Sequence, residues 1–449
     1  MKRVAIRPRE KGQVSTAQRS DGALTIGPIR LYGGVTHRHA LIAIYSALTT
    51  ISLLVFINLV QPYLFVQVLD IPRSQLGSTT GRLAALHEIV AIVCMFLVGA
   101  LSDRWGRRLI YSAGFLFMGI GYFAYPLADN LTQLVIFRAL FAVGGGTVVV
   151  MFTAIAIDYS TDDSRGKWIG LLNFVSGIGV LIMTLVMSRI PAMLESAGYD
   201  GSTAGRYTFW IASALCLFSA TVLALGLKSV VGSSAPRSTT LASIKTAVTL
   251  GFRDQRLALT YGAAFIGRGD LVIIGMFLPL WVTQAALQAG LSSSEAAIRA
   301  GLLLFVHQIA VVAWAFLAGF LNDRFNKLAL LVLAFSLASF GYFSLWLVND
   351  PFSTLCFVGV IILATGEITI VITNNAIVGD QAPIAVRGGV LGLLGVAGGI
   401  GIILATLLGG EAFDAFGGGA PFLMMVGFNV LIIIWVLWLM NVEDRRTQT

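Results

Sequence analysis

Long apolar runs are the feature that most restricts what this chain can fold into. A helix needs about 20 mostly apolar residues to cross a bilayer. The sequence contains twelve such runs, near 39–66, 75–102, 108–127, 131–157, 168–190, 207–228, 257–284, 295–320, 328–348, 352–378, 388–410 and 420–441. Apolar residues make up 57% of the chain and charged residues 12%, and the mean hydropathy of +0.86 lies outside the usual range for soluble domains. The sequence therefore predicts an all-α integral membrane protein with twelve transmembrane helices.

The charges between the runs predict the orientation. Most of the 30 Lys and Arg residues fall in both tails and in one alternate set of loops. Because loops rich in Lys and Arg stay on the cytoplasmic side, we expect a multi-pass protein of the cytoplasmic (inner) membrane with both termini in the cytoplasm. Residues 1–38 are polar and basic and lack the apolar core of a signal peptide, so they are predicted to form a cytoplasmic tail that can contact anionic lipid. The net charge of +8 then needs no nucleic-acid partner.

The chain repeats itself. GRLAALHEIVAIVCMFLVGALSDRW at 81–105 aligns with GLLLFVHQIAVVAWAFLAGFLNDRF at 301–325, and a second match pairs Asp158 with Asp380. We expect a six-helix bundle over 39–228, a cytoplasmic linker over 229–256, a second six-helix bundle over 257–441 and a cytoplasmic tail over 442–449. Such repeats are typical of secondary transporters, which bind their substrate near the midplane between the halves.

The loop after the second run carries a family resemblance. GALSDRWGRR at 99–108 resembles the cytoplasmic loop motif of the major facilitator superfamily, and GFLNDRFNK at 319–327 resembles its weaker copy in the second half. The resemblance covers roughly 39–441, and it implies that family's fold of two pseudo-symmetric six-helix bundles and its alternating access. It also implies a cytoplasmic gating role for Asp103 and, less directly, for Asp323. The predicted gating motif comprises Gly99, Asp103, Arg104, Gly106, Arg107, Arg108, Asp323 and Arg324.

Charged and polar side chains within the apolar runs are the candidates for function, because such groups are costly in a bilayer and face a cavity or a partner. The carboxylates Glu88, Asp270 and Glu367 are candidates for proton coupling. Arg138 joins them because it resembles the family's helix-four arginine; a guanidinium cannot carry the proton, but it can change the proton affinity of a nearby carboxylate. The candidates for the substrate cavity are Asn58, His87, Arg268, His307, Gln308, Asn374 and Asn375.

The repeat separates His87 from Glu88. His87 recurs as His307, which favours a shared structural or gating role for the two histidines. Glu88 is replaced by Gln308, which keeps the shape and loses the charge. This favours Glu88 as the proton site. The alternative is a static buried ion pair, for instance between Glu88 and Arg138.

The expected function is secondary active transport of a small organic solute, coupled to protons, by a monomer that contacts membrane lipids. Drug or metabolite efflux by antiport and uncoupled facilitated diffusion are alternatives within the fold. A non-transporting membrane sensor or scaffold is the alternative outside it. The sequence has no nucleophile–base pair that would favour an enzyme. The cysteines lie singly in apolar runs, and we expect neither a metal nor a cofactor.

Overall fold

Twelve long helices dominate the computed structural model, which describes residues 24–161, 163–228, 248–251, 254–348, 350–383 and 387–448. Within these residues, twelve helices are long and apolar enough to cross a membrane. They correspond one by one to the twelve predicted runs, so the all-α membrane fold is confirmed. The predicted linker over 229–256 lies largely outside the described residues.

The elements divide between two bundles. The first contains β1 (Leu24–Ile26), β2 (Ile29–Leu31), α1 (His37–Gln67), η2 (Arg73–Gln75), α2 (Leu76–Trp105), α3 (Arg107–Ala124), η3 (Tyr125–Leu127), α4 (Leu131–Tyr159), α5 (Arg165–Val186), η4 (Met187–Arg189), α6 (Ile190–Ser196) and α7 (Gly201–Gly226). The second contains α9 (Gln255–Gln288), α10 (Ser293–Arg324), α11 (Lys327–Val348), α12 (Leu355–Gln381), α13 (Arg387–Phe416) and α14 (Ala420–Gln448). The last helix therefore continues past the boundary predicted at 441.

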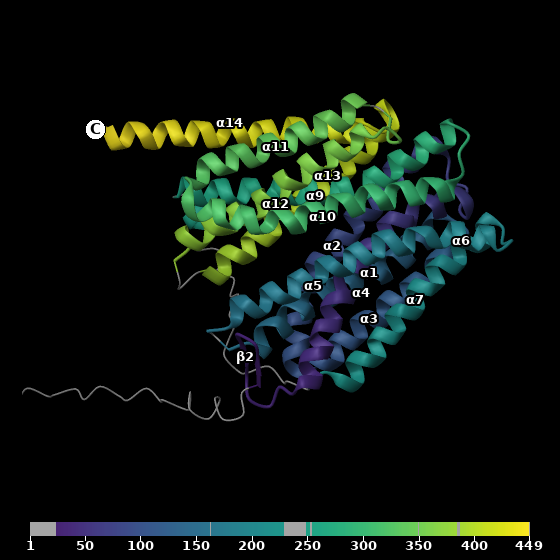
Figure 1. Ribbon diagram of the computed structural model, residues 1–449, viewed down its shortest axis with the longest axis horizontal. Helices are drawn as coiled ribbons and strands as arrows, with labels where there is room; N and C mark the ends of the chain where they lie inside the picture. The colour runs from purple at the N-terminus through teal and green to yellow at the C-terminus, as the bar shows by residue number, and fades with distance from the viewer. Residues whose placement is uncertain are drawn as a thin grey trace, which may run out of the picture.

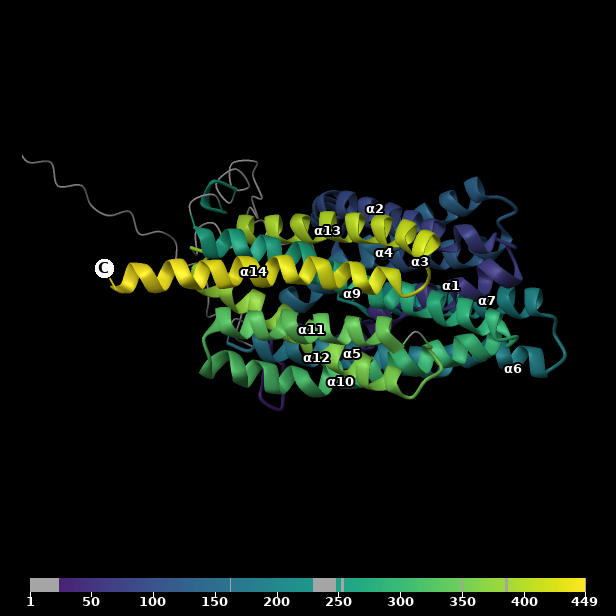
Figure 2. The same cartoon turned by 90° about the horizontal axis from the view of Figure 1, so that it is seen from above.

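The two bundles lie side by side, the first purple to teal and the second green to yellow (Figure 1). The β1–β2 hairpin and the end of α14 lie at the same end of the molecule, on the left of Figures 1 and 2. Because successive helices alternate in direction, the predicted gating motifs at 99–108 and 319–327 also lie there. We call this the motif end and the opposite one the far end.

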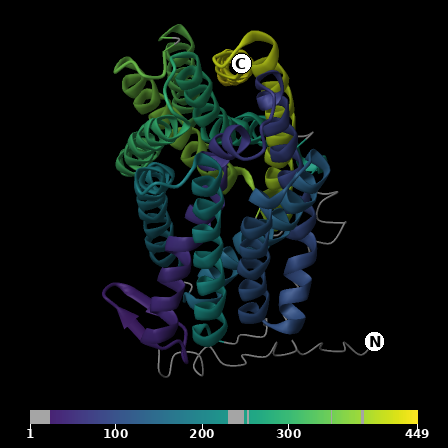
Figure 3. The same cartoon turned by 90° about the vertical axis from the view of Figure 1, so that its right-hand side faces the viewer.

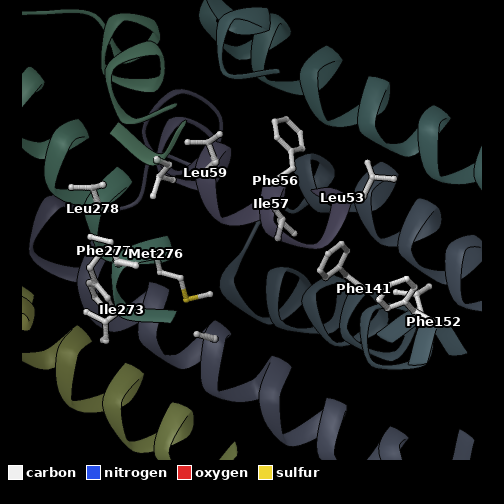
Figure 4. Packing of buried hydrophobic residues seen from close by; sticks show 14 of the residues in the cluster. Leu53, Phe56, Ile57, Leu59, Phe141, Phe152, Ile273, Met276, Phe277 and Leu278 are labelled. Atoms are coloured by element: carbon white, nitrogen blue, oxygen red, sulfur yellow. The ribbon is translucent and has the colours of Figure 1, made fainter. Parts of the chain in front are cut away.

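Helix α2 packs along α13, α5 packs along α10, and α1 contacts α9 and α10, so α1, α2 and α5 of the first bundle meet α9, α10 and α13 of the second. Buried side chains of α1, such as Phe56 and Ile57, and of α9, such as Ile273 and Phe277, form the apolar core on either side of this contact (Figure 4).

Glycines show that the repeat is also structural. Gly179 of α5 lies so close to the backbone carbonyl of Leu48 in α1 that a Cβ would overlap it. Its counterpart Gly401 of α13 lies in the same way against the carbonyl of Phe265 in α9. Each bundle thus brings two backbones together at a glycine, as small residues do between helices in lipid.

A two-stranded antiparallel hairpin, visible at the lower left of Figure 3, lies within the segment predicted to be a tail. Leu31 is fully buried, and the Tyr32 N–H donates to the carbonyl oxygen of Tyr159 at the end of α4 (3.0 Å). Lys228 also contacts this segment, since its Nζ donates to the Gly33 carbonyl (3.1 Å). The hairpin covers the motif end of the first bundle because its few apolar residues pack on a surface there. That surface cannot be recognised from the sequence alone.

Candidate functional site

A cavity of about 860 Å³ lies between the two bundles. Helices α1, α2, α4 and α5 line one side of it, and α9, α10, α12 and α13 line the other. Most of the lining is apolar. Its strongly polar members are Asn58, His87, Glu88, Arg138, Asn173, His307 and Gln308. This size falls in the range of sites for small organic ligands.

The first bundle contributes a buried arginine to this cavity. Arg138 of α4 is 1% exposed, and its Nη2 donates to the Asn58 side-chain oxygen of α1 at 3.0 Å. The guanidinium also lies over the ring of Phe141, 5.4 Å from its centroid. Its Nε and Nη1 are buried and have no hydrogen-bond partner within the described structure. In this structure Arg138 forms no salt bridge with Glu88 or any other described carboxylate, so the alternative of a static Glu88–Arg138 ion pair is not observed.

His87 lies beside this arginine on α2. Its ring packs against Phe141, with centroids 5.8 Å apart, and its Nδ1 has no partner among the described residues. Gly145 of α4 faces it, and a Cβ at that position would come within 2.9 Å of the ring. Glycine therefore provides the space that the imidazole occupies.

The second bundle places a carboxylate beside the matching histidine. His307 Nε2 of α10 lies 2.9 Å from Glu367 Oε2 of α12, and Glu367 is 1% exposed. Glu367 is the repeat counterpart of Gly145, since Asp158 and Asp380 fix the register of these helices. One bundle thus surrounds its histidine with a cation and a glycine, and the other with an acid.

A second acid joins this buried group. The Tyr342 hydroxyl donates to the Asp270 carbonyl oxygen (2.7 Å) and lies 3.4 Å from Glu367 Oε1. Asn429 donates to Asp270 Oδ1 (3.3 Å), while Asp270 Oδ2 has no described partner. We call His307, Glu367, Tyr342, Asp270 and Asn429 the acidic cluster. His307 is its only member among the residues that line the cavity.

Sequence reasoning missed Tyr342 and Asn429. The signal for Tyr342 was present, because Gly341–Tyr342–Phe343 repeats Gly121–Tyr122–Phe123. Asn429 could have been noticed as a lone amide in an apolar run.

Glu88 lies where the two bundles cross at the cavity. Gly399 of α13 packs against it, and a Cβ there would come within 3.0 Å of Glu88 Oε1. Gln308 packs in the matching way near Gly177 of α5. Among the lining residues, Glu88 is the one carboxylate. Arg268 of α9 packs against Gly398, so Glu88 and Arg268 approach adjacent residues of α13.

The structure separates the remaining candidates from the cavity. Arg268 and Asp270 point apart, as their spacing predicts: Arg268 lies against the Gly395 carbonyl of α13, and Asp270 is buried within the second bundle. Asn374 is buried and donates to the Thr260 carbonyl (3.2 Å), while Asn375 is exposed. None of these four lines the cavity.

At the motif end, the gating residues bond within their own bundles. Arg107 is buried and donates to Asp158 of α4 (3.0 Å), and it also pairs with Asp103 (2.7 Å). The repeat counterparts Lys327 and Asp380 form the equivalent ion pair in the second bundle. Gly106, with φ of 89°, makes the sharp turn between α2 and α3 that only glycine adopts readily.

The other members of the predicted motif lie on the surface of this end. Arg104, Asp323 and Arg324 are exposed, Arg108 is partly exposed, and a Cβ at Gly99 would meet no described atom within 4 Å. Arg324 lies over the ring of Phe320, 4.1 Å from its centroid. Within the described residues, the ion pairs and ring contacts of the gating motif stay inside one bundle.

At the far end, the bundles close on one another. The Asp414 carboxylate of α13 accepts hydrogen bonds from the backbone N–H groups of Gly77 and Ser78, both at 2.7 Å. It thereby caps the N-terminus of α2 from the opposite bundle, which is a favourable place for a negative charge. Arg82 and Glu411 form an exposed salt bridge beside it (3.1 Å). Sequence reasoning missed this closure, since none of these residues lies in the middle of an apolar run.

Close glycine contacts complete the closure. Gly81 of α2 meets the carbonyl of Thr406 in α13, and Gly301 of α10 meets that of Thr184 in α5. The four residues are related by the repeat. The cavity is therefore sealed at the far end, whereas the glycines Gly99 and Gly319 of α2 and α10 meet no described neighbour at the motif end.

Comparison with known proteins defines the class. The family model described as Major Facilitator Superfamily matches residues 41–406 and 299–449. The chain belongs to this superfamily of membrane transporters, and the predicted resemblance is confirmed.

Among solved structures, the nucleoside transporter NupG superposes with a TM-score of 0.72 at 15% identity, covering 89% of this chain and 99% of that one. The D-xylose–proton symporter superposes with a TM-score of 0.70 at 18% identity, covering 89% and 96%. At these identities the likeness shows the fold alone.

Among sequence relatives, magnetosome protein MamH of Paramagnetospirillum magneticum is 29% identical over 89% of this chain and 93% of its own length. Magnetosome protein MamZ of Magnetospirillum gryphiswaldense is 26% identical over 88% of this chain, which spans 62% of that relative's length. Multidrug transporter protein MdtP of Bacillus subtilis is 26% identical over 44% of this chain and 34% of its own length.

Proposed function

We propose that this protein is a proton-coupled secondary transporter that moves a small organic solute across the cytoplasmic membrane by alternating access. The observation that carries the proposal is the central cavity. It lies between two repeat-related bundles, is sealed at the far end and has the carboxylate of Glu88 on its wall. With both termini in the cytoplasm, as the basic loops favour, the conformation is open towards the inside.

Proton coupling needs a group whose protonation depends on the relative position of the two bundles. Glu88 meets this requirement, because it faces the cavity and packs against Gly399 of the opposite bundle. A carboxylate near Arg268 is favoured in its ionised form, and one moved into an apolar contact is favoured in its neutral form. Rocking α2 against α13 changes this balance, so proton binding and conformation become linked.

The acidic cluster offers a second route for the proton. His307 lines the cavity and contacts Glu367, so it can pass a proton between the cavity and that buried acid. Asp270 and Glu367 lie in this same buried cluster, because the Tyr342 hydroxyl donates to the main-chain carbonyl of Asp270 and lies 3.4 Å from Glu367 Oε1. The cluster therefore forms the alternative coupling site.

The first prediction tests Glu88. In proteoliposomes with an imposed pH gradient and a panel of solutes, the parent protein should accumulate its solute. Glu88→Gln should abolish accumulation but retain counterflow exchange, because the neutral amide keeps the shape and cannot release a proton. Asp129→Asn, an exposed acid at the far end, is the matched control and should behave like the parent.

Several outcomes would change the proposal. If Glu88→Gln accumulates solute like the parent and Glu367→Gln does not, the acidic cluster is the coupling site. Flux that is insensitive to a protonophore would identify an uncoupled facilitator. If no solute in a broad panel moves, the transport proposal fails and a sensor or scaffold remains.

Drug or metabolite efflux is the second candidate. The mainly apolar lining of the cavity and the partial similarity to a multidrug transporter favour it. Cells that express the protein would then retain less of an amphipathic dye than cells expressing Glu88→Gln. Equal dye retention in both would count against this candidate.

Location and orientation can be tested together. A C-terminal green fluorescent protein fusion should be fluorescent and follow the cell outline, whereas a C-terminal alkaline phosphatase fusion should be inactive. Fluorescence on an internal membrane would contradict the proposed location. The similarity to relatives named magnetosome proteins is the reason to look for this outcome.

A further inference from the structure

Arg138 is a buried cation with no carboxylate partner among the residues that the structure describes. It is 1% exposed, and its described contacts are Asn58, an amide, and the ring of Phe141. Two of its nitrogens, Nε and Nη1, are buried and unpartnered. No described carboxylate forms a salt bridge with it.

Arg107, the other buried arginine among the described residues, has carboxylate partners in Asp158 and Asp103. Leaving a buried charge uncompensated costs several kcal/mol. On the wall of a cavity, this cost can be offset by a ligand that brings the negative charge with it.

The neighbours of Arg138 complete an anion site. The Asn58 oxygen already accepts from Arg138, which leaves its amide N–H groups free to donate. His87 lies on the same wall and can donate from its ring. Guanidinium binds carboxylate in a two-pronged geometry that an amide and a histidine can supplement.

The opposite wall has a different character. Besides His307 and Gln308, it is lined by apolar residues of α9 and α10, among them Leu271, Val272, Met276, Val311, Val312 and Phe316. A cavity of about 860 Å³ with such a wall is far larger than a simple inorganic anion requires.

We infer that the cavity binds an organic anion with an apolar body, whose charged group is held by Arg138, Asn58 and His87 and whose body packs against α9 and α10. This inference rests on the proposed transport function, since it names the substrate class for the same cavity. It assigns the first bundle to recognition of the solute's charge and leaves proton binding to Glu88 or the acidic cluster.

Thermal unfolding of the full-length protein in nanodiscs tests the site with matched probes. Benzoate and hexanoate should raise Tm, whereas the neutral benzamide and hexanamide should not. Arg138→Gln should weaken carboxylate binding by about 10- to 100-fold, as loss of a hydrogen bond to a charged group predicts. Arg206→Gln removes the same charge from an exposed position on α7 and should bind like the parent.

Asn58→Asp tests the same anion site if the Arg138→Gln variant does not fold. The new carboxylate would lie about where the Asn58 oxygen now accepts from Arg138, so it supplies the missing counterion from within. We expect a higher Tm without ligand and loss of the Tm shift with benzoate. A variant that keeps the parent's response to benzoate would overturn the site.

Failure of this inference is distinguishable from failure of the transport proposal. If the acids do not shift Tm of the parent but a neutral solute is carried in proteoliposomes, the anion site is overturned and transport stands. If the acids bind and no solute moves, the site stands and transport falls. Equal shifts with nitrate and with the organic acids would overturn the apolar body as part of the recognition.

Discussion

Gly145 and Glu367 occupy the same place in the two halves, and this difference gives the two histidines different neighbours. In the first bundle the glycine leaves room for His87 beside a cation, and in the second the acid bonds His307. The sequence shows both histidines and all three carboxylates. It does not show that Glu367 contacts His307, because that contact joins residues on two different helices.

A matched pair of tyrosines tests the acidic cluster at this scale. Tyr342→Phe removes the hydroxyl that contacts Asp270 and Glu367. Tyr122→Phe removes its counterpart, a hydroxyl that donates to the Leu53 carbonyl. Each should cost about 1 kcal/mol of stability. If the cluster carries the proton, only Tyr342→Phe should also lower proton-driven accumulation. Equal loss of accumulation in the two variants would show a purely structural role.

At the scale of elements, the apolar runs predict each helix well. Every segment that crosses the membrane must be apolar and must form its backbone hydrogen bonds within itself. The pairing of helices is different. Glycines in runs indicate close packing in general, but the contact of Gly81 with Thr406 depends on how two bundles meet. The β1–β2 hairpin was likewise not predicted, since three-residue strands leave too short a pattern.

Gly81→Val tests the far-end closure. The added side chain overlaps the Thr406 carbonyl, so only the closed far end is penalised. Overpacking of this kind costs about 1–3 kcal/mol, which shifts a two-state equilibrium roughly 5- to 150-fold. Spin labels at Leu101 of α2 and Leu391 of α13 should move closer as the motif end closes. Gly427→Val, where a Cβ meets no described atom, is the control and should leave the distance unchanged.

At the scale of the whole molecule, closure at one end and opening at the other are two aspects of one movement. The structure has the far end bonded through Asp414 and the gating residues paired within their own bundles. Under the proposed gating role, Asp103 contacts the second bundle only when the motif end closes.

Asp103→Asn should therefore destabilise the conformation in which the motif end is closed. The population should shift towards the observed conformation, so the Leu101–Leu391 label distance should lengthen or stay long. Combining it with Gly81→Val should bring the distance part of the way back. If Asp103→Asn instead shortened this distance, the gating role would be contradicted.

The sequence by itself determined that the chain lies in a bilayer, how many helices cross it and that the two halves repeat. The reason is that each crossing of a bilayer needs a long apolar helix, which is visible in the sequence. It also supplied the polar residues on which a site could depend. Only the tertiary structure decided which of them meet. It placed Arg138 on the wall of the cavity with no carboxylate partner among the described residues, buried Asp270 and Glu367 inside the second bundle, and left Glu88 where the two bundles meet. The reason is physical: a helix fixes which residues share a face, but the neighbour of that face is chosen by packing between segments far apart in the chain.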